Sequence, residues 1–289
     1  MLLEHILQSY ARRFPLRRGK YRIIERFGAR PDGKGSFIRR SRLQYGGFLM
    51  DCDLRMQLQR QFHYFGTYYL EDKIIGAWSH YARNASVIFD VGANAGIYSL
   101  AAAAASPGAA IHAFEPTPEI VDHLEGTVEL NGLADCLNVQ GCAVGKERGR
   151  IFLNRFSGEK NDNEGMNFVS DVGRGAETIE VPIVSLDSFC EENGISGIDL
   201  LKVDVQGHEP AVFEGAKGLL KRKALRTIFL ELNWNHAERE SCPARKAVQL
   251  LAAAGFRFAD ANAGDRRFKE AGPWLESLSD VVASTSFPG

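Results

Sequence analysis

The sequence predicts an α/β fold built on a doubly wound, mostly parallel sheet, because buried strand patterns alternate with helical patterns along residues 81–289. The clearest unit is residues 87–100, in which an apolar run meets a glycine turn and then an alanine-rich helix pattern. Two further apolar runs, residues 198–203 and 226–232, are typical of strands buried on both faces. Ligands of such sheets bind at the carboxyl ends of the strands.

The glycine turn after the first strand indicates which ligand it suits. Gly92 and Gly96 bracket the turn, Asn94 stands between them, and Asp90 precedes the first glycine by two residues. This spacing lacks the G-x-G-x-x-G pattern of dinucleotide sites. A carboxylate at the strand end suits a cation better than a phosphate, so we expect S-adenosylmethionine, with its sulfonium and amino groups, rather than a nicotinamide cofactor.

The second strand supports the same cofactor. Residues 110–114 form the strand pattern, and Glu115 follows it, in the position where an acid accepts both ribose hydroxyls in Rossmann-type sites. Thr117 and Pro118 then begin a helix. A third strand is expected at residues 138–142. The expected cofactor-binding residues are Asp90, Gly92, Asn94, Gly96, Glu115, Ala143 and Asp204.

The fourth strand ends in the candidate catalytic residues. Asp204, His208 and Glu209 follow residues 198–203, and Gly207 permits a sharp turn between them. If the acceptor is an alcohol, it is a poor nucleophile, and a positioned base accelerates its reaction by roughly 10²–10⁴-fold. His208 is the preferred base because its ordinary pKa is near ~6.5, with Asp204 orienting it or acting itself. A helix-start role for His208 is the alternative.

Glu231, at the end of the next strand, is the third catalytic candidate, and an ion pair with Arg or Lys is its alternative role. Asp204, Glu231 and Asn233 are hard oxygen donors that could together hold a metal. Because the chain has no adjacent acidic pair here to strengthen such a site, we expect no metal.

The composition favours one large α/β domain with an appendage in 289 residues. We divide the chain into a basic N-terminal extension or cap, residues 1–80, and a cofactor-binding domain, residues 81–289. Within residues 1–60 there are 14 Lys and Arg against 5 Asp and Glu. Such an arm can meet nucleic acid, an anionic membrane surface, an acidic carrier protein or an anionic substrate, or fold onto the acidic remainder.

Other segments complete the expected architecture. The extension is expected to contain a helix at residues 2–14 and a hairpin within residues 37–50. Residues 155–177 are polar and glycine-rich, as in an insertion or lid. Residues 256–260 and 280–283 are expected to close the sheet as an antiparallel pair. An aromatic group at residues 62–69 is expected in the core or a dimer contact, with a ligand wall as the alternative.

Localisation follows from what the sequence lacks. It has no apolar run of ~20 residues and no signal-peptide pattern, and its five cysteines show no metal spacing. We therefore expect a cytoplasmic protein without a transmembrane segment or structural zinc.

The ordered motifs resemble the FkbM family of S-adenosylmethionine-dependent methyltransferases. The resemblance covers about residues 48–235, and its matching segments are residues 89–96, 114–116, 184–187, 198–209 and 213–216. It implies a class I methyltransferase, Rossmann-like sheet whose last strand is antiparallel. It also implies O-methylation of a small molecule, either a sugar or glycan or a polyketide-type natural product, free or carrier-bound. Gln206 stands where the family usually has Glu.

Other functions stay open at this stage. The basic arm suggests a nucleic-acid or protein methyltransferase, but the turn after the fourth strand lacks the Pro-Pro-aromatic sequence typical of base methylation, so we expect no nucleic-acid partner. Gln206 is the one feature that favours a catalytically silent cofactor-binding protein of the same fold. A homodimer is left open.

Overall fold

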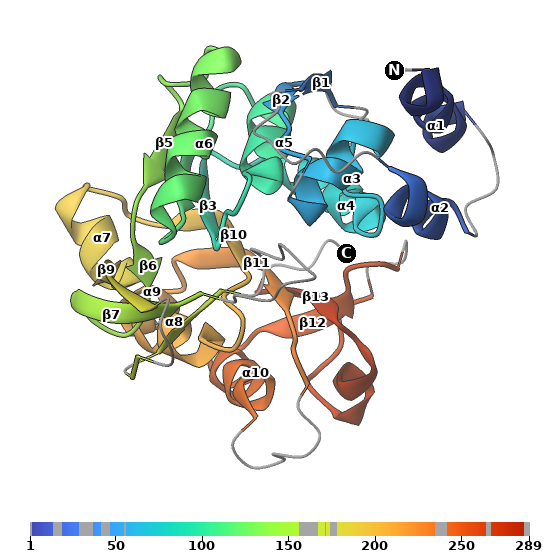
Figure 1. Cartoon of the computed structure of the whole chain (residues 1–289). Coiled ribbons are helices and arrows are strands. Elements are labelled where there is room, and N and C mark those ends of the chain that lie inside the picture. Colours follow the sequence, from blue (N-terminus) through green and yellow to red (C-terminus); the bar gives the residue numbers. More distant parts are fainter. Residues whose placement is uncertain are drawn as a thin grey trace.

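The computed structural model describes residues 2–13, 19–28, 37–41, 47–54, 56–155, 167–170, 172–173, 178–234, 242–263 and 267–285. Its centre is a seven-stranded sheet (Figure 1). In sheet order the strands are β12 (Arg257–Asp260), β13 (Asp280–Ser284), β11 (Leu225–Glu231), β10 (Ile198–Val203), β3 (Val87–Val91), β4 (Ala110–Phe114) and β5 (Leu137–Gln140). Strand β13 pairs antiparallel with both β11 and β12, and the other strand pairs of this sheet are parallel. The predicted sheet and its closing antiparallel pair are confirmed.

Two apolar cores cover the two faces of this sheet, which explains the continuous apolar runs of its strands. Along β3, Ile88 packs into one core and Phe89 into the other, and along β10 Leu200 and Leu201 do the same. One face carries α4 (Asp72–Ala82), α5 (Ile97–Ala105) and α6 (Pro118–Leu130), and the other α7 (Leu186–Glu192), α8 (Glu209–Glu214), α9 (Lys217–Lys221) and α10 (Pro243–Ala253) (Figure 1). A 3₁₀ turn, η2, spans Pro273–Ser277.

The N-terminal segment contains α1 (Leu2–Arg13), α2 (Lys20–Phe27), the hairpin β1 (Ile38–Arg40) and β2 (Leu49–Asp51), and α3 (Gln57–Phe65). The predicted helix and hairpin are confirmed. Helix α3 is not among the predicted helices, although Leu58, Phe62 and Phe65 recur at helical spacing. None of the helices in the described parts of the chain has the length and apolarity needed to cross a membrane.

The expected boundary at residue 80 does not separate two cores. Met50, Phe62 and Trp78 are fully buried in the same cluster as Ile88 and Leu100. Helices α1 and α2 instead pack into a small separate cluster against α3. We therefore propose that the main domain begins near Phe48, and that the two first helices form the appendage.

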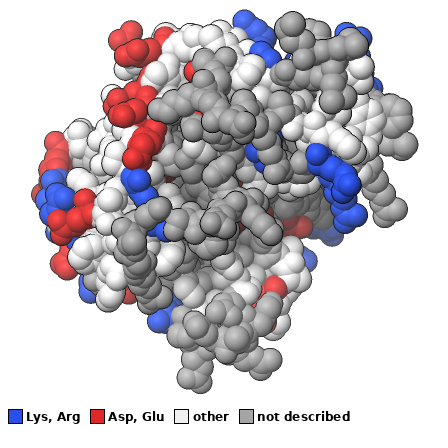
Figure 2. Space-filling model, viewed as in Figure 1, with Lys and Arg blue, Asp and Glu red and all other residues white. Residues whose placement is uncertain are grey.

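Charge is unevenly distributed over the molecule. On the face shown in Figure 2, acidic side chains are most frequent at the left of the view, on the side of α6 and α7, where basic groups lie among them. Basic groups also mark the right-hand side near α1 and α2. The basic extension and the acidic helices therefore lie at different sides of this face.

A second, four-stranded sheet is inserted between β5 and β10. It contains β6 (Ala143–Val144), β9 (Thr178–Val184), β7 (Gly149–Asn154) and β8 (Phe168–Ser170), in that order. The expected third strand at residues 138–142 therefore ends earlier, and Ala143 begins the inserted sheet. Of the expected lid, residues 156–166, 171 and 174–177 lie outside the described residues, and β8 belongs to the rest.

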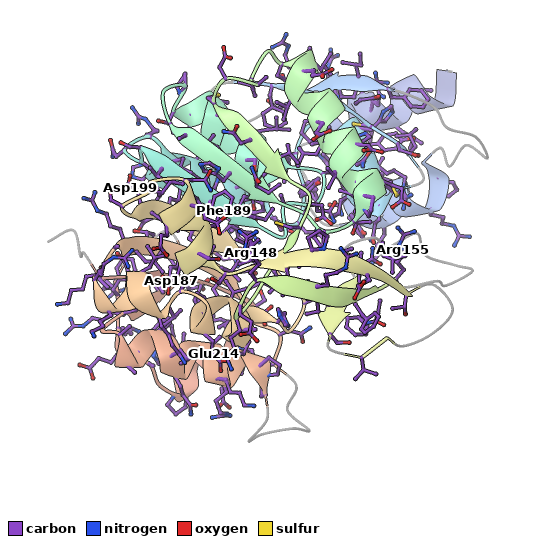
Figure 3. The ribbon with its side chains drawn as sticks, turned by 90° about the vertical axis from the view of Figure 1, so that its left-hand side faces the viewer. Arg148, Arg155, Asp187, Phe189, Asp199 and Glu214 are labelled. Atoms are coloured by element: carbon purple, nitrogen blue, oxygen red, sulfur yellow. The ribbon has the colours of Figure 1, made fainter. Side chains whose placement is uncertain are left out.

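Exposed ion pairs connect this inserted sheet to the main domain at both ends of β7. Arg148 and Arg155 flank β7 (Figure 3). Arg148 pairs with Glu192 of α7, and Arg155 pairs with Glu119 of α6 at 2.7 Å. Such exposed pairs each contribute at most about 1 kcal/mol, so they orient the inserted sheet more than they stabilise it.

Candidate functional site

A cavity opens at the carboxyl edge of the main sheet, where the strand order reverses between β3 and β10. This is the place where doubly wound sheets bind ligands. The glycine turn after β3, the ends of β4, β10 and β11, and the start of the inserted sheet all line it. Four carboxylates line the cavity: Glu71, Glu115, Asp204 and Glu231. Lys202 is the sole cationic side chain in the lining that the described residues form.

Gly92 fixes how closely β3 and β10 approach beneath this cavity. Its φ of +82° lies in the left-handed region that glycine adopts readily. A Cβ at this position would lie 1.9 Å from the backbone carbonyl oxygen of Asp204. Only glycine therefore fits between the first turn and the backbone that carries Asp204.

The amides of the glycine turn are all used within the protein. The amides of Gly92 and Ala93 both donate to the carbonyl oxygen of Phe114, and the amide of Gly96 donates to the carbonyl oxygen of Ala93. The amide of Asn94 donates to the carboxylate of Glu115, and the amide of Ala95 donates to the side-chain oxygen of Asn94. In dinucleotide and phosphate loops, such amides point at the phosphate instead. The turn does not fit a pyrophosphate, which agrees with the expectation against a nicotinamide cofactor.

Glu115 presents a buried carboxylate to the cavity. Its Oε1 accepts the amide of Thr117 at 2.9 Å and its Oε2 accepts the amide of Asn94 at 3.0 Å. Burial raises the pKa of Glu115, and these hydrogen bonds from the backbone oppose that rise. Each oxygen can accept a second hydrogen bond, so the carboxylate can also receive the two hydroxyls of a ribose.

Two of the expected cofactor-binding residues support the turn from behind, outside the cavity lining. Asp90 is 1% exposed and its Oδ2 accepts the hydroxyl of Ser99 at 2.6 Å, which fixes α5 against β3. A Cβ on Gly96 would lie 2.2 Å from Leu124, so this glycine lets α5 approach α6. Neither residue lines the cavity, and their part in cofactor binding stays a prediction. Asn94 and Ala143 do line the cavity.

Lys202 is the centre of the polar side of the cavity, and the sequence motifs do not single it out. The residue is 4% exposed, its Nζ donates to Asp204 Oδ2 at 3.0 Å, and it lies 4.6 Å from the ring centre of Tyr98. The hydroxyl of Tyr98 in turn donates to Glu71 Oε2 at 2.7 Å. A lysine inside a mostly apolar strand was the available signal, because lysines are almost never buried without a partner.

The charges around Lys202 determine its state. Burial would lower the pKa of Lys202, but Asp204 and Glu71 outweigh that effect and hold the pKa above its ordinary value. Burial would likewise raise the pKa of Asp204, whose side chain is 30% exposed, but the charge of Lys202 and the hydrogen bonds with Lys202, Glu231 and Gln206 together outweigh burial and lower it. Lys202 and Asp204 therefore form an ion pair at the floor of the cavity.

Gln206 joins Asp204 to Glu231. Its Nε2 lies 2.9 Å from Asp204 Oδ1 and 2.9 Å from Glu231 Oε2. Burial and the neighbouring Asp204 raise the pKa of Glu231. Two of the three catalytic candidates thus meet in the cavity. Asn233, the third residue of the alternative metal set, is exposed, and no cluster of three or more His, Cys, Asp or Glu suited to a metal occurs among the described residues.

The structure places His208 outside the residues that line the cavity, and its assignment as the base stays a prediction. A Cβ on Gly145 would lie 2.9 Å from His208 Nε2, so the imidazole packs against the inserted sheet. The reason is Gly207, whose φ of +102° turns the chain away from the cavity before α8 begins. Glu209 Oε1 accepts the amide of Gly207 at 3.0 Å and closes this turn. The helix-start alternative for His208 fits this position.

Three further lining residues come from the N-terminal part of the chain. Leu58, Tyr68 and Glu71 contribute one wall of the cavity. Of the aromatic group at residues 62–69, Tyr68 reaches this wall, whereas Phe62 is fully buried in the main core. Tyr68 belongs to the aromatic group for which a ligand wall was the alternative, whereas no motif in the sequence marks Leu58 or Glu71.

Comparison with known proteins agrees with this architecture. The model of the family described as "Methyltransferase FkbM domain" matches residues 90–258, more than half of the chain. The "31-O-demethyl-FK506 methyltransferase FkbM" of Streptomyces tacrolimicus is 29% identical over 160 residues, which cover 47% of this chain and 61% of that protein. The "2-O-methyltransferase NoeI" of Sinorhizobium fredii is 28% identical over 176 residues, covering 57% and 70%.

Among solved structures, an O-methyltransferase from Bacillus cereus in complex with SAH is similar over 73% of this chain and 78% of its own, with a TM-score of 0.43 and 15% identity. The match to the FkbM protein of Streptomyces tacrolimicus spans about three fifths of the length of that relative. By the match of its residues 90–258, this chain belongs to the FkbM methyltransferase family, as the sequence predicts.

Proposed function

We propose that this chain transfers the methyl group of S-adenosylmethionine to a hydroxyl oxygen of a small molecule. The acceptor class is a sugar or glycan, or a polyketide-type natural product. The observation that carries the proposal is the single cavity that joins Glu115 and the phosphate-incompatible turn to the Lys202–Asp204 ion pair. The names of the FkbM and NoeI relatives, which specify O-methylation, support this class of acceptor.

The residues present fit such a cofactor. S-adenosylmethionine supplies an electrophilic methyl group on a cationic sulfonium, and four carboxylates against one lysine make the cavity favourable for a cation. Glu115 would hold the ribose, and small Ala93 and Ala143 leave room along the same wall. Asp204, kept ionised by Lys202, would accept the proton of the acceptor hydroxyl.

Glu115→Gln tests the cofactor half of the cavity. We expect the affinity for S-adenosylhomocysteine to fall by about 10–100-fold, because a hydrogen bond to a charged group contributes about 1.5–3 kcal/mol. Isothermal titration measures this change. The matched control is Glu119→Gln, which removes an exposed carboxylate of α6 outside the lining and should leave the affinity unchanged. Equal affinity in wild type and Glu115→Gln would exclude Glu115 as the ribose acceptor.

Asp204→Asn tests the proton acceptor. The amide has the shape of the carboxylate but cannot take a proton, so we expect the rate of methyl transfer to fall by about 10²–10⁴-fold. The assay follows tritiated methyl transfer from S-adenosylmethionine to whichever hydroxylated acceptor the wild type methylates. Binding of S-adenosylhomocysteine, measured alongside, separates a loss of chemistry from a loss of cofactor. A variant that retains the full rate would rule Asp204 out as the base.

The biological setting of this activity is a further part of the proposal. A cytoplasmic location, a free or carrier-bound acceptor, a homodimer and the lack of a nucleic-acid partner all stay predictions. Among the described residues, no basic residue of α1 or α2 lines the cavity, so we assign them no part in methyl transfer.

A further inference from the structure

Gln206 occupies a strained backbone position between two carboxylates. Its φ of +53° lies in the left-handed region, which is uncommon for a residue other than glycine. In this conformation its side-chain amide donates to Asp204 and Glu231, each at 2.9 Å. A primary amide has two N–H donors and no charge, so it can serve two carboxyl groups at once. Strain that persists beside a functional cavity calls for a functional explanation.

We propose that Gln206 positions Asp204 and Glu231 as a carboxyl pair that holds one proton between them, and that this pair receives the acceptor proton. The inference rests on the proposed methyl transfer. It goes further because it assigns Glu231 the resting proton and gives Gln206 a positioning role.

The charges that face the pair support a single proton. Lys202 of β10 donates to Asp204 alone, at 3.0 Å, and so neutralises one carboxylate. The other titratable groups facing the pair bring no further cation. They are Glu71 at the start of α4, Asp90 of β3, Tyr98 of α5, Glu209 of α8, and Asp280, which is paired with Glu231 between β13 and β11. Two neighbouring carboxyl groups that share one cation cannot both ionise without a large cost in electrostatic free energy.

The directions of titration agree with this geometry. Burial opposes ionisation of both groups, but at Asp204 the charge of Lys202 and the hydrogen bonds with Lys202, Glu231 and Gln206 together outweigh it and lower the pKa of that carboxyl. At Glu231 burial and the Asp204 charge act together and raise the pKa. Because the two groups interact, the proton belongs to the pair, with Glu231 as its principal site.

A proton-balanced turnover follows from this resting state. As the acceptor oxygen bonds to the methyl carbon, the methyl–sulfur bond breaks and its electron pair stays on sulfur. The hydroxyl proton passes to Asp204, so the pair holds two protons, and one returns to solvent before the next cycle. A glutamate in place of Gln206 would add a third carboxylate and remove both N–H donors from the pair.

Infrared difference spectroscopy of the ligand-free protein at pH 7 tests the resting proton. The spectrum of wild type minus Glu231→Gln should contain one carbonyl stretch of a protonated carboxyl group, with the downshift in deuterium oxide that marks an exchangeable proton. If the difference instead contains the stretches of an ionised carboxylate, Glu231 carries no proton and the proposal is wrong.

Gln206→Glu gives a second, independent readout if Glu231→Gln does not fold. It should add a protonated carboxyl band at pH 7, because the site has no cation for a third charge. The matched control Gln249→Glu, on the exposed face of α10, should add an ionised carboxylate only. An ionised band from Gln206→Glu would overturn the proposal. Titration of wild type with S-adenosylhomocysteine separately tests the proposed function, since the infrared result needs no ligand.

Discussion

Gly92→Ala is expected to abolish measurable binding of S-adenosylhomocysteine and to destabilise the fold by roughly 2–5 kcal/mol. The left-handed conformation costs about 1–2 kcal/mol for a residue with a Cβ. The larger effect is steric, because that Cβ would lie 1.9 Å from the carbonyl oxygen of Asp204. Forcing such an overlap apart typically costs a further 1–3 kcal/mol or so. The end of β10 must then move, and it carries Asp204 with it.

Variants at two other glycines distinguish the steric effect at Gly92 from the cost of the left-handed conformation and from the effect of adding a Cβ. Gly255 has a φ of +89° and a Cβ added there would meet nothing within 4 Å, so Gly255→Ala should cost only the conformational part, about 1–2 kcal/mol. Gly126, inside α6, likewise leaves a Cβ free of atoms within 4 Å and has no positive φ, so Gly126→Ala should be neutral or stabilise the helix by up to about 1 kcal/mol. Both should bind S-adenosylhomocysteine like the wild type.

Chemical denaturation and isothermal titration measure both quantities for the three variants. If Gly92→Ala behaves like Gly255→Ala in stability and keeps its affinity, the close approach of β3 and β10 does not shape the cofactor site. The variant would then show that the turn tolerates a side chain.

The sheet could be predicted because its signals are local. The first strand, its glycine turn and α5 follow one another within residues 87–105, and each has a clear period or turn residue. Glu115 is set by the end of the next strand, so its place at the cavity followed from the same pattern. The inserted sheet was harder to predict from the sequence, because β6 is two residues long and its partner β9 is far away in the sequence.

The polar side of the site depends on contacts between residues that are far apart in the sequence. Glu71 meets Lys202 through Tyr98 across three elements, so no spacing rule could connect them. His208 was preferred as a base for its ordinary pKa alone, yet one turn at Gly207 directs it away from the cavity. The ordinary pKa of a side chain therefore indicates which residues could act as a base. The direction of the chain after each strand determines which of those residues face the cavity.

Lys202→Met is expected to destabilise the protein by about 3–5 kcal/mol at pH 8, since breaking a buried ion pair leaves an uncompensated charge. The ammonium is 4% exposed and 3.0 Å from Asp204, with Glu71 and Glu231 nearby. Methionine fills a similar volume without charge, so packing contributes little to the loss. The control Lys217→Met, on the exposed surface of α9, should change stability by less than about 0.5 kcal/mol.

The pH dependence of that loss identifies its electrostatic origin. In the wild type, Lys202 holds the pKa of folded Asp204 below its ordinary 3.8, so this stabilisation is present above pH 3.8 and is lost as the pH falls through the folded value. Without the lysine, burial raises the pKa of folded Asp204 above that of the unfolded chain, and stability is lost as the pH rises instead. The deficit of Lys202→Met should therefore be largest near pH 8 and shrink steadily toward pH 4. Denaturation curves at pH 8, 6 and 4.5 measure it, and a deficit that is constant with pH would mean that Lys202 acts through packing rather than through its charge.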